Sequence, residues 1–373
     1  MRIMNKKYKS ITFICMNLEC GGTERVITNL ANHYSENNLN TSIITLGSAN
    51  LFNGFKVSRK TEIIELKKYS NYKFKSFWNC IYWIYEIKKY MKRNKNSIYI
   101  SFLTIPNILT ILASFPIKIL HYGSERVDPS YAEISLFWKV LRLIFYRKLK
   151  FLIVQTEEIK NNCKHFISDR RIKIIPNSIN LSIIKTQLNT IKNEKLKVLF
   201  IGRIEYQKGI DIFLEAIIKI SKENQRKPYD FEIIGDGSFS DLVQETIRVN
   251  NLKGFLKYRK KSETPLKHIK ECNIVMHPSR YEGMSNVVLE AMSYGKCVIS
   301  TYQASSGIIT NDKDGILIKR LSSLEIINSL EKVSSNRSLI NEIGLNAINT
   351  IKNKYSEKRI FKLWSKTLKL TNE

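Results

Sequence analysis

Short runs of β-branched and aromatic residues alternate with stretches of helical periodicity along almost the whole chain. This alternation predicts doubly wound α/β domains with parallel sheets. In the first half we expect strands at Ile11–Cys15, Thr41–Leu46, Ser97–Ser101, Ile117–His121 and Phe151–Gln155, and helices near Thr23–Ser35, Phe74–Arg93 and Tyr131–Lys148. In the second half we expect strands at Lys197–Ile201, Asp230–Ile234, Asn273–His277, Lys296–Ser300 and Gly315–Ile318, and helices near Ile210–Ser221, Ser240–Asn250, Val287–Ser293 and beyond Ser322.

The stretch from Pro176 to Glu194 follows neither period and separates the two halves, which indicates a linker. A chain of 373 residues is long enough for two domains of ~100–200 residues each. The pattern therefore predicts two Rossmann-like domains. Ligands of such sheets bind at the carboxyl ends of the strands, so we expect a ligand site in a cleft between the domains.

The charge of the chain is strongly unbalanced, because 61 Lys and Arg stand against 33 Asp and Glu and give a net charge of +28. Such an excess favours an anionic partner, and the classes are nucleic acid, an anionic membrane surface or phosphorylated substrates. A general richness in Lys, Asn and Ile offers a second explanation. No nucleic-acid recognition motif accompanies the charge, so we expect no nucleic-acid partner.

Cysteine usage and apolar segments bear on the compartment. The six cysteines form no C-x-x-C pair and have no His at metal-ligand spacing, which favours a reduced, cytosolic setting without a zinc site. The apolar run Ile11–Met16 is too short for a signal peptide. The longest apolar stretch, 105–120, contains two prolines and Lys118, so we expect a soluble or peripheral protein.

The sharpest chemical signals lie in the second half. Arg203 and Lys208 follow an expected strand and precede an amphipathic helix, where a forked guanidinium and a compact ammonium suit a diphosphate. Gly202 and Gly209 permit close backbone approach, and Gly235 and Gly237 after the next strand would open room for a nucleotide. A solvated basic pair and ordinary strand-to-helix turns are the alternative interpretation.

The segment HPSRYEGMSNVVLEAMSYG places Glu282 on a loop and Glu290 in the following helix. Ser285 is a plausible N-cap of that helix, and the amides at its start, from Met284 to Val287, would favour a phosphate. An acidic residue one or two turns into such a helix can accept both ribose hydroxyls. Two surface helix carboxylates are the alternative.

At these residues the chain resembles the family 4 retaining glycosyltransferases of GT-B fold, of the bacterial polysaccharide or lipopolysaccharide type. The resemblance rests on the E-x7-E pattern from Glu282 to Glu290, preceded by GRIEYQKG and followed by AMSYGKCVIS. It extends to GGTERV at 21–26, IPNSIN at 175–180 and the closing segment YSEKRIFKLWSKTLKL. It implies an acceptor domain over 1–180, a linker over 181–195, a nucleotide-sugar domain over 196–354 and a helix over 355–373 that returns to the first domain.

The resemblance also implies roles. Arg203 and Lys208 would hold the donor diphosphate, Glu282 would face the donor sugar, and Glu290 would face the ribose. The expected catalytic residues are Arg203, Lys208 and Glu282. The remaining expected donor-binding residues are Gly21, Gly22, Gly202, Gly235, Arg259, Gly283, Met284, Ser285, Asn286 and Val287. Relatives carry Gly at the position of Arg259, which would either stack on the base or be exposed.

In the first half, HYGSERVDPS resembles a bacterial subgroup with S-E-R-N-D-P after a strand, with Val127 in place of the usual Asn. His121 is the expected sugar contact, unless it is merely the last inward residue of its strand. Ser124, Glu125 and Arg126 are the rival contacts to acceptor or sugar.

Asp312-Lys313-Asp314 spells D-x-D, a metal-binding motif of another glycosyltransferase architecture. Here it lies in a turn before a strand, and the resemblance implies that Arg203 and Lys208 neutralise the leaving diphosphate instead. We therefore expect no metal and no cofactor beyond the nucleotide-sugar co-substrate. Transfer passes through an oxocarbenium-like state, and the resemblance implies front-face retention of configuration.

The first-half segments 71–93 and 131–148 combine Phe, Trp and Tyr with flanking Lys and Arg, which is typical either of interfacial helices or of core helices with a basic outer face. We expect a peripheral enzyme on the inner face of the cytoplasmic membrane. It would transfer a hexosyl or N-acetylhexosaminyl group, from a UDP-sugar by preference, to a lipid-linked or oligosaccharide acceptor. A sugar-nucleotide epimerase of GT-B fold is the first alternative, and a basic nucleic-acid-binding protein is the second and less favoured one.

Overall fold

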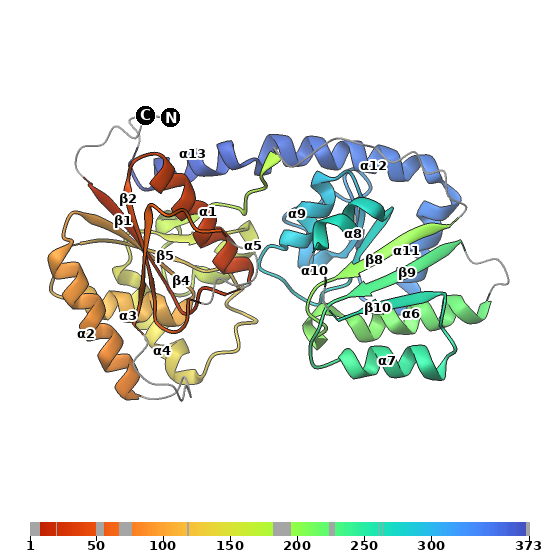
Figure 1. Cartoon of the computed structure of the whole chain (residues 1–373), viewed down its shortest axis with the longest axis horizontal. Helices are drawn as coiled ribbons and strands as arrows, with labels where there is room; N and C mark the ends of the chain where they lie inside the picture. The colour runs from red at the N-terminus through yellow and green to blue at the C-terminus, as the bar shows by residue number, and fades with distance from the viewer. Residues whose placement is uncertain are drawn as a thin grey trace. The chain divides into compact units, whose positions relative to one another are not determined.

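The computed structural model describes residues 8–19, 21–49, 56–66, 77–117, 119–181, 195–223, 228–260, 262 and 264–370. The chain divides into two compact units, shown in Figure 1. Unit 1 consists of Met1–Asn177 together with Lys358–Glu373, and unit 2 consists of Ser178–Glu357. The closing segment of the chain therefore belongs to the first unit.

Unit 1 contains a seven-stranded sheet of order β3-β2-β1-β4-β5-β6-β7 in which every strand pairing is parallel. Its strands are β1 (Ser10–Cys15), β2 (Asn40–Thr45), β3 (Thr61–Glu65), β4 (Ser97–Phe102), β5 (Leu120–Ser124), β6 (Leu152–Val154) and β7 (Ile172–Ile174). Its helices are α1 (Gly22–Glu36), α2 (Phe77–Arg93), α3 (Thr104–Ser114), α4 (Leu136–Phe145), η1 (Tyr146–Lys148), α5 (Glu157–Cys163), η2 (Asp169–Arg171) and α13 (Glu357–Thr367).

Unit 2 contains a six-stranded parallel sheet of order β10-β9-β8-β11-β12-β13. Its strands are β8 (Leu196–Ile201), β9 (Tyr229–Ile234), β10 (Leu256–Arg259), β11 (Ile274–His277), β12 (Cys297–Thr301) and β13 (Ile316–Ile318). Its helices are η4 (Tyr206–Lys208), α6 (Ile210–Glu223), α7 (Ser240–Val249), α8 (Pro265–Glu271), α9 (Asn286–Ser293), α10 (Tyr302–Ser305), α11 (Ser323–Ser335), α12 (Arg337–Thr350) and η5 (Ile351–Tyr355).

Apolar cores cover both faces of each sheet, which explains the nearly continuous apolar character of the strands. In unit 1, one core joins β1 and β4 to α1 and α13, and another joins β2 and β4 to α2 and α3. In unit 2, one core lies under α6, α7 and α11, and another under α8, α9 and α12. The predicted fold class, with two parallel-sheet α/β domains, is confirmed.

The helix α13 is attached to unit 1 by aromatic packing. Trp364 is buried in the same core as Phe13 and Phe102, and its ring lies 6.4 Å from that of Phe102. The ring of Phe361 stacks on His33 of α1 at 4.2 Å. These contacts explain why the last helix belongs to the first unit.

The chain passes from one unit to the other twice, and the two segments in which it does so pair with each other. Ile179 bridges Ser356, and the Ile179 amide donates to the Tyr355 carbonyl at 2.8 Å. Most of the predicted linker, residues 182–194, lies outside the described residues, so the linker stays a prediction.

Several predicted boundaries were wrong. The strand predicted at Ile117–His121 begins at Leu120 and ends at Ser124, and the helix predicted from Tyr131 begins at Leu136. The start predicted at Phe74 lies outside the described residues. The prediction also missed helix α3, which overlaps the apolar stretch 105–120. Pro106 is in the first turn of this helix, where the missing N–H of a proline removes no helical hydrogen bond.

Helices α2 and α4 present large apolar side chains to solvent. On α2, Phe77 and Trp78 are 68% and 74% exposed, and on α4, Leu136 and Phe137 are 75% and 59% exposed. The single fully buried residue of α4 is Arg142, whose guanidinium lies 4.8 Å from the centre of the Phe166 ring. None of the described helices is long and apolar enough to cross a membrane.

Candidate active site

The site residues predicted in the second half, apart from Arg259, gather where the strand order of unit 2 changes direction. Strand β8 lies between β9 and β11 in the sheet, so the loops that follow β8 and β11 diverge from this point. Such a switch point is where open parallel sheets bind ligands. Arg203 follows β8, and His277 is the last residue of β11.

Glycines allow the loops at this edge to approach closely. A Cβ at Gly235 (φ +153°) would lie 1.8 Å from the Gly202 carbonyl oxygen, so the loops after β8 and β9 fit only without a side chain there. A Cβ at Gly209 (φ +66°) would lie 2.0 Å from the Pro278 carbonyl oxygen, which brings the end of η4 against the loop after β11. By contrast, a Cβ at Gly202 (φ +151°) would meet no heavy atom within 4 Å. The space in front of Gly202 is open.

Lys208, Glu282 and His277 form the charged centre of the site. The Lys208 ammonium donates to the Glu282 carboxylate, and both side chains are largely buried. His277 Nε2 lies 3.5 Å from Glu282 Oε1. The residues come from η4, from the loop before α9 and from the end of β11, so the topology of the sheet brings together side chains that are distant in sequence.

The cluster sets the ionisation of its members. Burial alone would raise the pKa of the Glu282 carboxyl, but the Lys208 charge and the His277 hydrogen bond outweigh burial and hold that pKa well below its usual range. Burial lowers the pKa of His277, and the Lys208 charge acts in the same direction against the pull of Glu282. The site therefore holds one carboxylate, one ammonium and a neutral imidazole at neutral pH.

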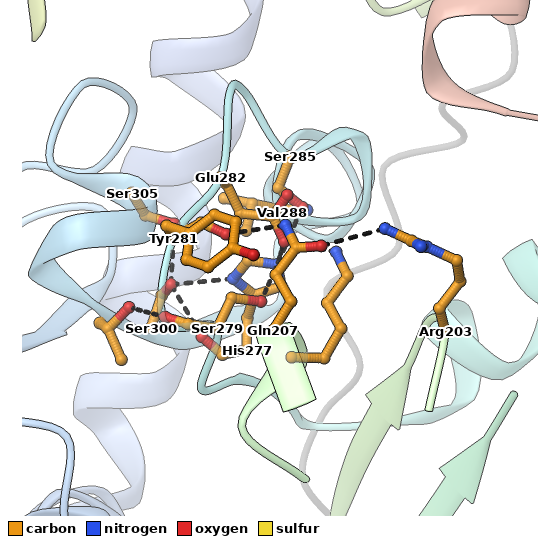
Figure 2. A network of polar contacts seen from close by, with 12 residues as sticks. Arg203, Gln207, His277, Ser279, Tyr281, Glu282, Ser285, Val288, Ser300 and Ser305 are labelled. Carbon is orange, nitrogen blue, oxygen red and sulfur yellow. Dashed lines mark hydrogen bonds and ion pairs between the residues drawn. The ribbon is translucent and has the colours of Figure 1, made fainter. Parts of the chain in front are cut away.

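Hydroxyl groups hold the His277 ring from both sides, as Figure 2 shows. Ser300 Oγ lies 3.0 Å from Nδ1, and the hydroxyls of Ser285 and Ser279 lie 3.0 Å and 3.3 Å from Nε2. Ser300 in turn contacts Ser305 Oγ at 2.7 Å. The imidazole is thereby fixed next to Glu282 by residues of β12, α10 and the loop before α9.

Gln207 connects the two loops that carry the charges. Its side chain accepts from Arg203 Nη2 at 3.0 Å and donates to the Tyr281 carbonyl at 3.0 Å (Figure 2). Its own carbonyl accepts from the Arg280 amide at 2.8 Å. Arg203 is exposed and lies on the open side of this link.

A salt bridge next to this link fastens the same loops. Arg280 donates through Nη1 and Nη2 to the Asp211 carboxylate at 2.8 Å and 2.7 Å, and its guanidinium lies 3.6 Å from the centre of the Tyr206 ring. Asp211 is in the first turn of α6, and Tyr206 begins η4. The loop with Glu282 is thus fixed against the helix that follows Lys208.

The predicted N-cap of α9 is present. Ser285 has extended backbone angles and its hydroxyl accepts from the Val288 amide at 3.5 Å, while Met284 is buried beneath the helix. Gly283, Asn286 and Val287 lie on either side of this cap, and Glu290 is half-buried in the second turn. The structure therefore brings the predicted loop and helix residues of unit 2 to one edge of the sheet.

Arg259 is at the outer edge of that sheet. It ends β10, and its Nε donates to Glu232 Oε1 at 2.9 Å. The side chain is more than half exposed. Its contact with the base stays a prediction.

The glycine pair of unit 1 begins α1. Gly21 is the N-cap and Gly22 the first helical residue. The carboxylate of Glu24 fills the space over Gly21, since a Cβ there would lie 2.1 Å from Glu24 Oε2. Burial raises the pKa of this carboxyl.

The predicted position of His121 was wrong. Because β5 begins at Leu120, His121 is at the amino end of the strand, opposite the edge where parallel sheets bind ligands. Its ring is buried, Nε2 lies 2.7 Å from Ser101 Oγ, and burial lowers its pKa to about 3. The structure gives no support to His121 as a sugar contact.

The rival residues do lie at the carboxyl end of β5. Ser124 ends the strand, Glu125 accepts from the hydroxyls of Thr104 and Tyr146, and Arg126 donates through Nη2 to Asn177. Arg126 Nε and Nη1 are buried and have no hydrogen-bond partner among the described residues. Burial lowers the Arg126 pKa to about 9, which leaves it a cation at neutral pH.

The two acidic residues of the D-x-D sequence stabilise the turn before β13. Asp314 is buried and accepts from the Thr310 amide and the Thr350 hydroxyl, and Asp312 pairs with Lys332. In the parts of the chain that the structure describes, no group of three His, Cys, Asp or Glu side chains is arranged to hold a metal ion.

Sequence reasoning missed the residues that support the charged centre: Gln207, Asp211, His277, Ser279, Arg280 and Ser300. One signal was present, because His277 ends a predicted strand at the carboxyl edge. The others act through contacts between loops that are distant in sequence, which no local pattern encodes.

Comparison with known proteins agrees with this geometry. Residues 20–183 match the model described as Glycosyltransferase Family 4, and residues 195–336 match Glycosyl transferases group 1. A Campylobacter jejuni protein named GalNAc-alpha-(1->4)-GalNAc-alpha-(1->3)-diNAcBac-PP-undecaprenol alpha-1,4-N-acetyl-D-galactosaminyltransferase is 26% identical, over 90% of this chain and 92% of its own length.

Two further proteins extend the comparison. An Escherichia coli protein named UDP-Gal:alpha-D-GlcNAc-diphosphoundecaprenol alpha-1,3-galactosyltransferase is 26% identical over 62% of this chain and 63% of its own length. The crystal structure of Anabaena HepE in complex with UDP aligns with a TM-score of 0.81 at 15% identity, over 97% of this chain and all of that one, a likeness of fold. Since the two family models together cover most of the chain, it belongs to the GT-B glycosyltransferases, with a family 4 domain followed by a group 1 domain.

Proposed function

We propose that the chain is a retaining, metal-independent glycosyltransferase that moves a hexosyl or N-acetylhexosaminyl group from a UDP-sugar to a growing lipid-linked glycan of a bacterial surface polysaccharide. The observation that carries the proposal is the Lys208, Glu282 and His277 cluster at the switch point of unit 2, with Arg203 beside it. The relatives from C. jejuni and E. coli, whose names specify diphosphoundecaprenol-linked acceptors, support the acceptor class.

The cations of the site suit the leaving group of this reaction. Negative charge builds on the departing diphosphate, and preorganised cations lower the barrier most when they face that charge. Arg203 has an exposed guanidinium and Lys208 an ammonium whose partner is Glu282. We propose that both cations contact the diphosphate and that Lys208 then shares its charge between the diphosphate and Glu282.

Glu282 is suited to binding rather than to proton transfer. A carboxyl whose pKa is held well below its usual range stays ionised and accepts hydrogen bonds, so it fits a contact to donor-sugar hydroxyls. Glu290, one helical turn or more into α9, is proposed for the ribose. The leaving phosphate itself would take the acceptor proton in front-face retention.

On the acceptor side we propose Arg126 as the first contact. It is a buried cation with unfilled donors at the carboxyl edge of the sheet of unit 1, and acceptors of the proposed class carry a diphosphate. We further propose that the exposed apolar residues of α2 and α4 rest on the inner face of an anionic cytoplasmic membrane.

A two-step experiment tests the proposed function. A panel of nucleotide sugars is first screened for a rise in melting temperature, since a ligand at 100 times its Kd adds ~2.7 kcal/mol of stability. The best donor is then incubated with glycans linked to diphosphoundecaprenol. We expect free UDP and an extended product whose new linkage keeps the anomeric configuration of the donor, as read by NMR. An isomerised sugar nucleotide formed without acceptor would identify an epimerase instead.

A further inference from the structure

A second charged site lies in unit 1, at the edge of the sheet opposite the ligand-binding edge. A cavity of about 440 Å³ opens where β5, β6 and β7 begin and where α3 ends. The polar side chains that line it are Ser114, His121, Lys148, Lys150, Arg170 and Arg171. Since β5 is five residues long, the cavity is roughly 16 Å from the carboxyl edge of that strand.

The lining of the cavity is strongly cationic. Four of its residues carry full positive charges, and among the lining residues that the structure describes none is acidic. The neighbouring Asp169 is engaged elsewhere, because its carboxylate lies 3.4 Å and 3.3 Å from the ammonium groups of Lys160 and Lys164. The end of α3 contributes a partial negative charge of about one half, which four cations exceed. The cavity therefore favours an anion.

The fold holds the cations around the cavity. Arg171 Nη1 donates to the Arg147 carbonyl at 2.8 Å, and Lys150 Nζ lies 5.9 Å from the centre of the Phe151 ring. The four charges come from three separate segments: η1, the residue pair before β6, and η2. His121 provides a neutral wall, since burial removes its charge.

Exposed apolar side chains lie close in sequence to two of the residues that line the cavity, Ser114 and Lys148. Phe115 follows Ser114 directly and is 76% exposed. Ile144, more than half exposed on α4, is four residues before Lys148 in a continuous helical segment, a rise of roughly 6–8 Å. A free inorganic anion gains nothing from exposed apolar side chains near its site, whereas a phospholipid places its phosphate beside its acyl chains.

We propose that this cavity binds the headgroup phosphate of an anionic membrane phospholipid, while Phe115 and the exposed residues of α4 enter the acyl boundary. The proposal rests on the membrane association proposed above and adds a defined headgroup site to it. The site is separate from the transfer site, and it would fix which edge of unit 1 faces the bilayer.

Flotation of the full chain with vesicles tests the proposal. Wild-type protein is expected to bind vesicles of phosphatidylglycerol and phosphatidylcholine far better than vesicles of phosphatidylcholine alone. Lys148→Gln combined with Lys150→Gln should weaken binding by about 30-fold, because each basic residue at an anionic surface contributes a factor of roughly five. The control, Lys222→Gln with Lys253→Gln, makes the same charge change at exposed positions of unit 2 and should stay within about twofold of wild type.

A charge-neutral variant separates the cavity from diffuse surface charge. Ser114→Trp fills the cavity without altering charge, and it should weaken binding to phosphatidylglycerol vesicles about as much as the double Lys variant does. Arg170→Gln, at an exposed position, gives a second route if Ser114→Trp lowers the melting temperature. Glycerol 3-phosphate should compete with the vesicles.

Each outcome is decisive. If Ser114→Trp and Arg170→Gln both bind vesicles as wild type does, the headgroup site is not in this cavity. Membrane association through surface charge would then still stand. Equal binding to neutral vesicles would overturn an anion site, and binding of soluble phosphate without vesicle binding would assign the cavity to free phosphate. Competition by diphosphoundecaprenol but not by phosphatidylglycerol would assign it to the acceptor lipid. Transfer to a water-soluble acceptor, measured in parallel, reports on the proposed function independently.

Discussion

At the scale of single residues, the site is governed by how a buried cluster shares its charge. Two opposite charges about 4 Å apart interact with ~4 kcal/mol at an effective dielectric constant of 20, so the Lys208 and Glu282 pair is a strong constraint on both side chains. We therefore expect a donor diphosphate to bind Lys208 while the contact between Lys208 and Glu282 persists. His277 stays neutral beside the pair and adds no competing charge.

The ionisation of this cluster predicts how stability depends on pH. In the folded state the pKa of His277 is below its ordinary value of 6.5, so the unfolded chain binds more protons once the pH falls below 6.5. The pKa values of His33 and His121 are lowered in the same way. The lowered pKa of Glu282 also makes the unfolded chain bind more protons, once the pH falls below 4.5. The contribution of these three histidines to the free energy of unfolding should therefore fall between pH 6.5 and pH 5, whereas the carboxyls of Glu24, Glu125 and Glu158, whose pKa values burial raises, act in the opposite direction.

Replacing His277 isolates its contribution to the pH dependence of the free energy of unfolding. His277→Gln should make the pH dependence shallower by at most ~1.4 kcal/mol per pH unit, because one proton is no longer linked to unfolding. Denaturant titrations at pH 7, 6 and 5 measure this effect, with His165→Gln as control. An identical pH dependence in wild type and His277→Gln would show that His277 titrates in the folded state as it does in the unfolded chain.

The charged residues on loops after strands were predictable from the sequence. The residues that hold them in place through hydrogen bonds were not. Arg203, Lys208 and Glu282 follow strands in a doubly wound pattern, so their approach to one edge follows from topology. Ser300 and Gln207 contribute through hydrogen bonds to residues that are distant in sequence, and their residue types occur anywhere on a surface. His121 was misplaced because a strand boundary moved by three residues.

At the scale of elements, the salt bridge between Arg280 and Asp211 joins α6 to the loop that carries Glu282. Its two parallel hydrogen bonds fix orientation as well as distance, a geometry that only a guanidinium supplies. We infer that Arg280 is a positioning residue for Glu282 and Lys208.

Loosening this bridge should reduce catalysis more than stability. Arg280→Ala and Asp211→Asn are each expected to lower kcat/KM by about tenfold to a hundredfold, since small displacements of catalytic groups are costly. Stability should fall by only ~1 kcal/mol, because both side chains are partly exposed. Arg280→Lys should fail to restore kcat, and Arg248→Ala on α7 is the matched control. A wild-type kcat/KM in Arg280→Ala would refute the positioning role.

Long amphipathic helices and the central strands were predicted well, whereas three of the four edge strands, β3, β7 and β10, were not. Strand β10 (Leu256–Arg259) alternates buried and exposed residues over four positions only, and β3 is likewise short, at the other sheet's edge. An alternation of apolar and polar residues of that length also occurs in loops. Helix α3 was missed for a different reason, because its residues are buried almost all round and therefore show no helical period.

At the scale of the whole molecule, the chain returns to its first unit to complete a core. Trp364 is almost fully buried against residues of β1 and β4. The sequence predicted this return only through the family resemblance, since helical periodicity does not say which core a helix joins.

Removing this side chain should destabilise unit 1. Trp364→Ala is expected to cost ~3–5 kcal/mol of unfolding free energy, the range for large aromatic side chains deleted from a core. Denaturant unfolding measures the loss, and Lys362→Ala at an exposed position of α13 serves as control. Equal unfolding midpoints for the two variants would contradict the burial of Trp364 in this core.

The central claim is that the charged centre of unit 2 stabilises the diphosphate leaving group of a glycosyl donor. The most direct measurement is the rate of UDP release and product formation for wild type, Arg203→Ala, Lys208→Ala and the control Lys222→Ala, with the donor and acceptor that the proposed screen selects. We expect the first two variants to lose roughly 10²–10³ in kcat while their melting temperatures stay close to that of the control, because each removes a cation that we propose faces the developing charge. A well-folded Lys208→Ala or Arg203→Ala variant with a near-normal rate would contradict the claim.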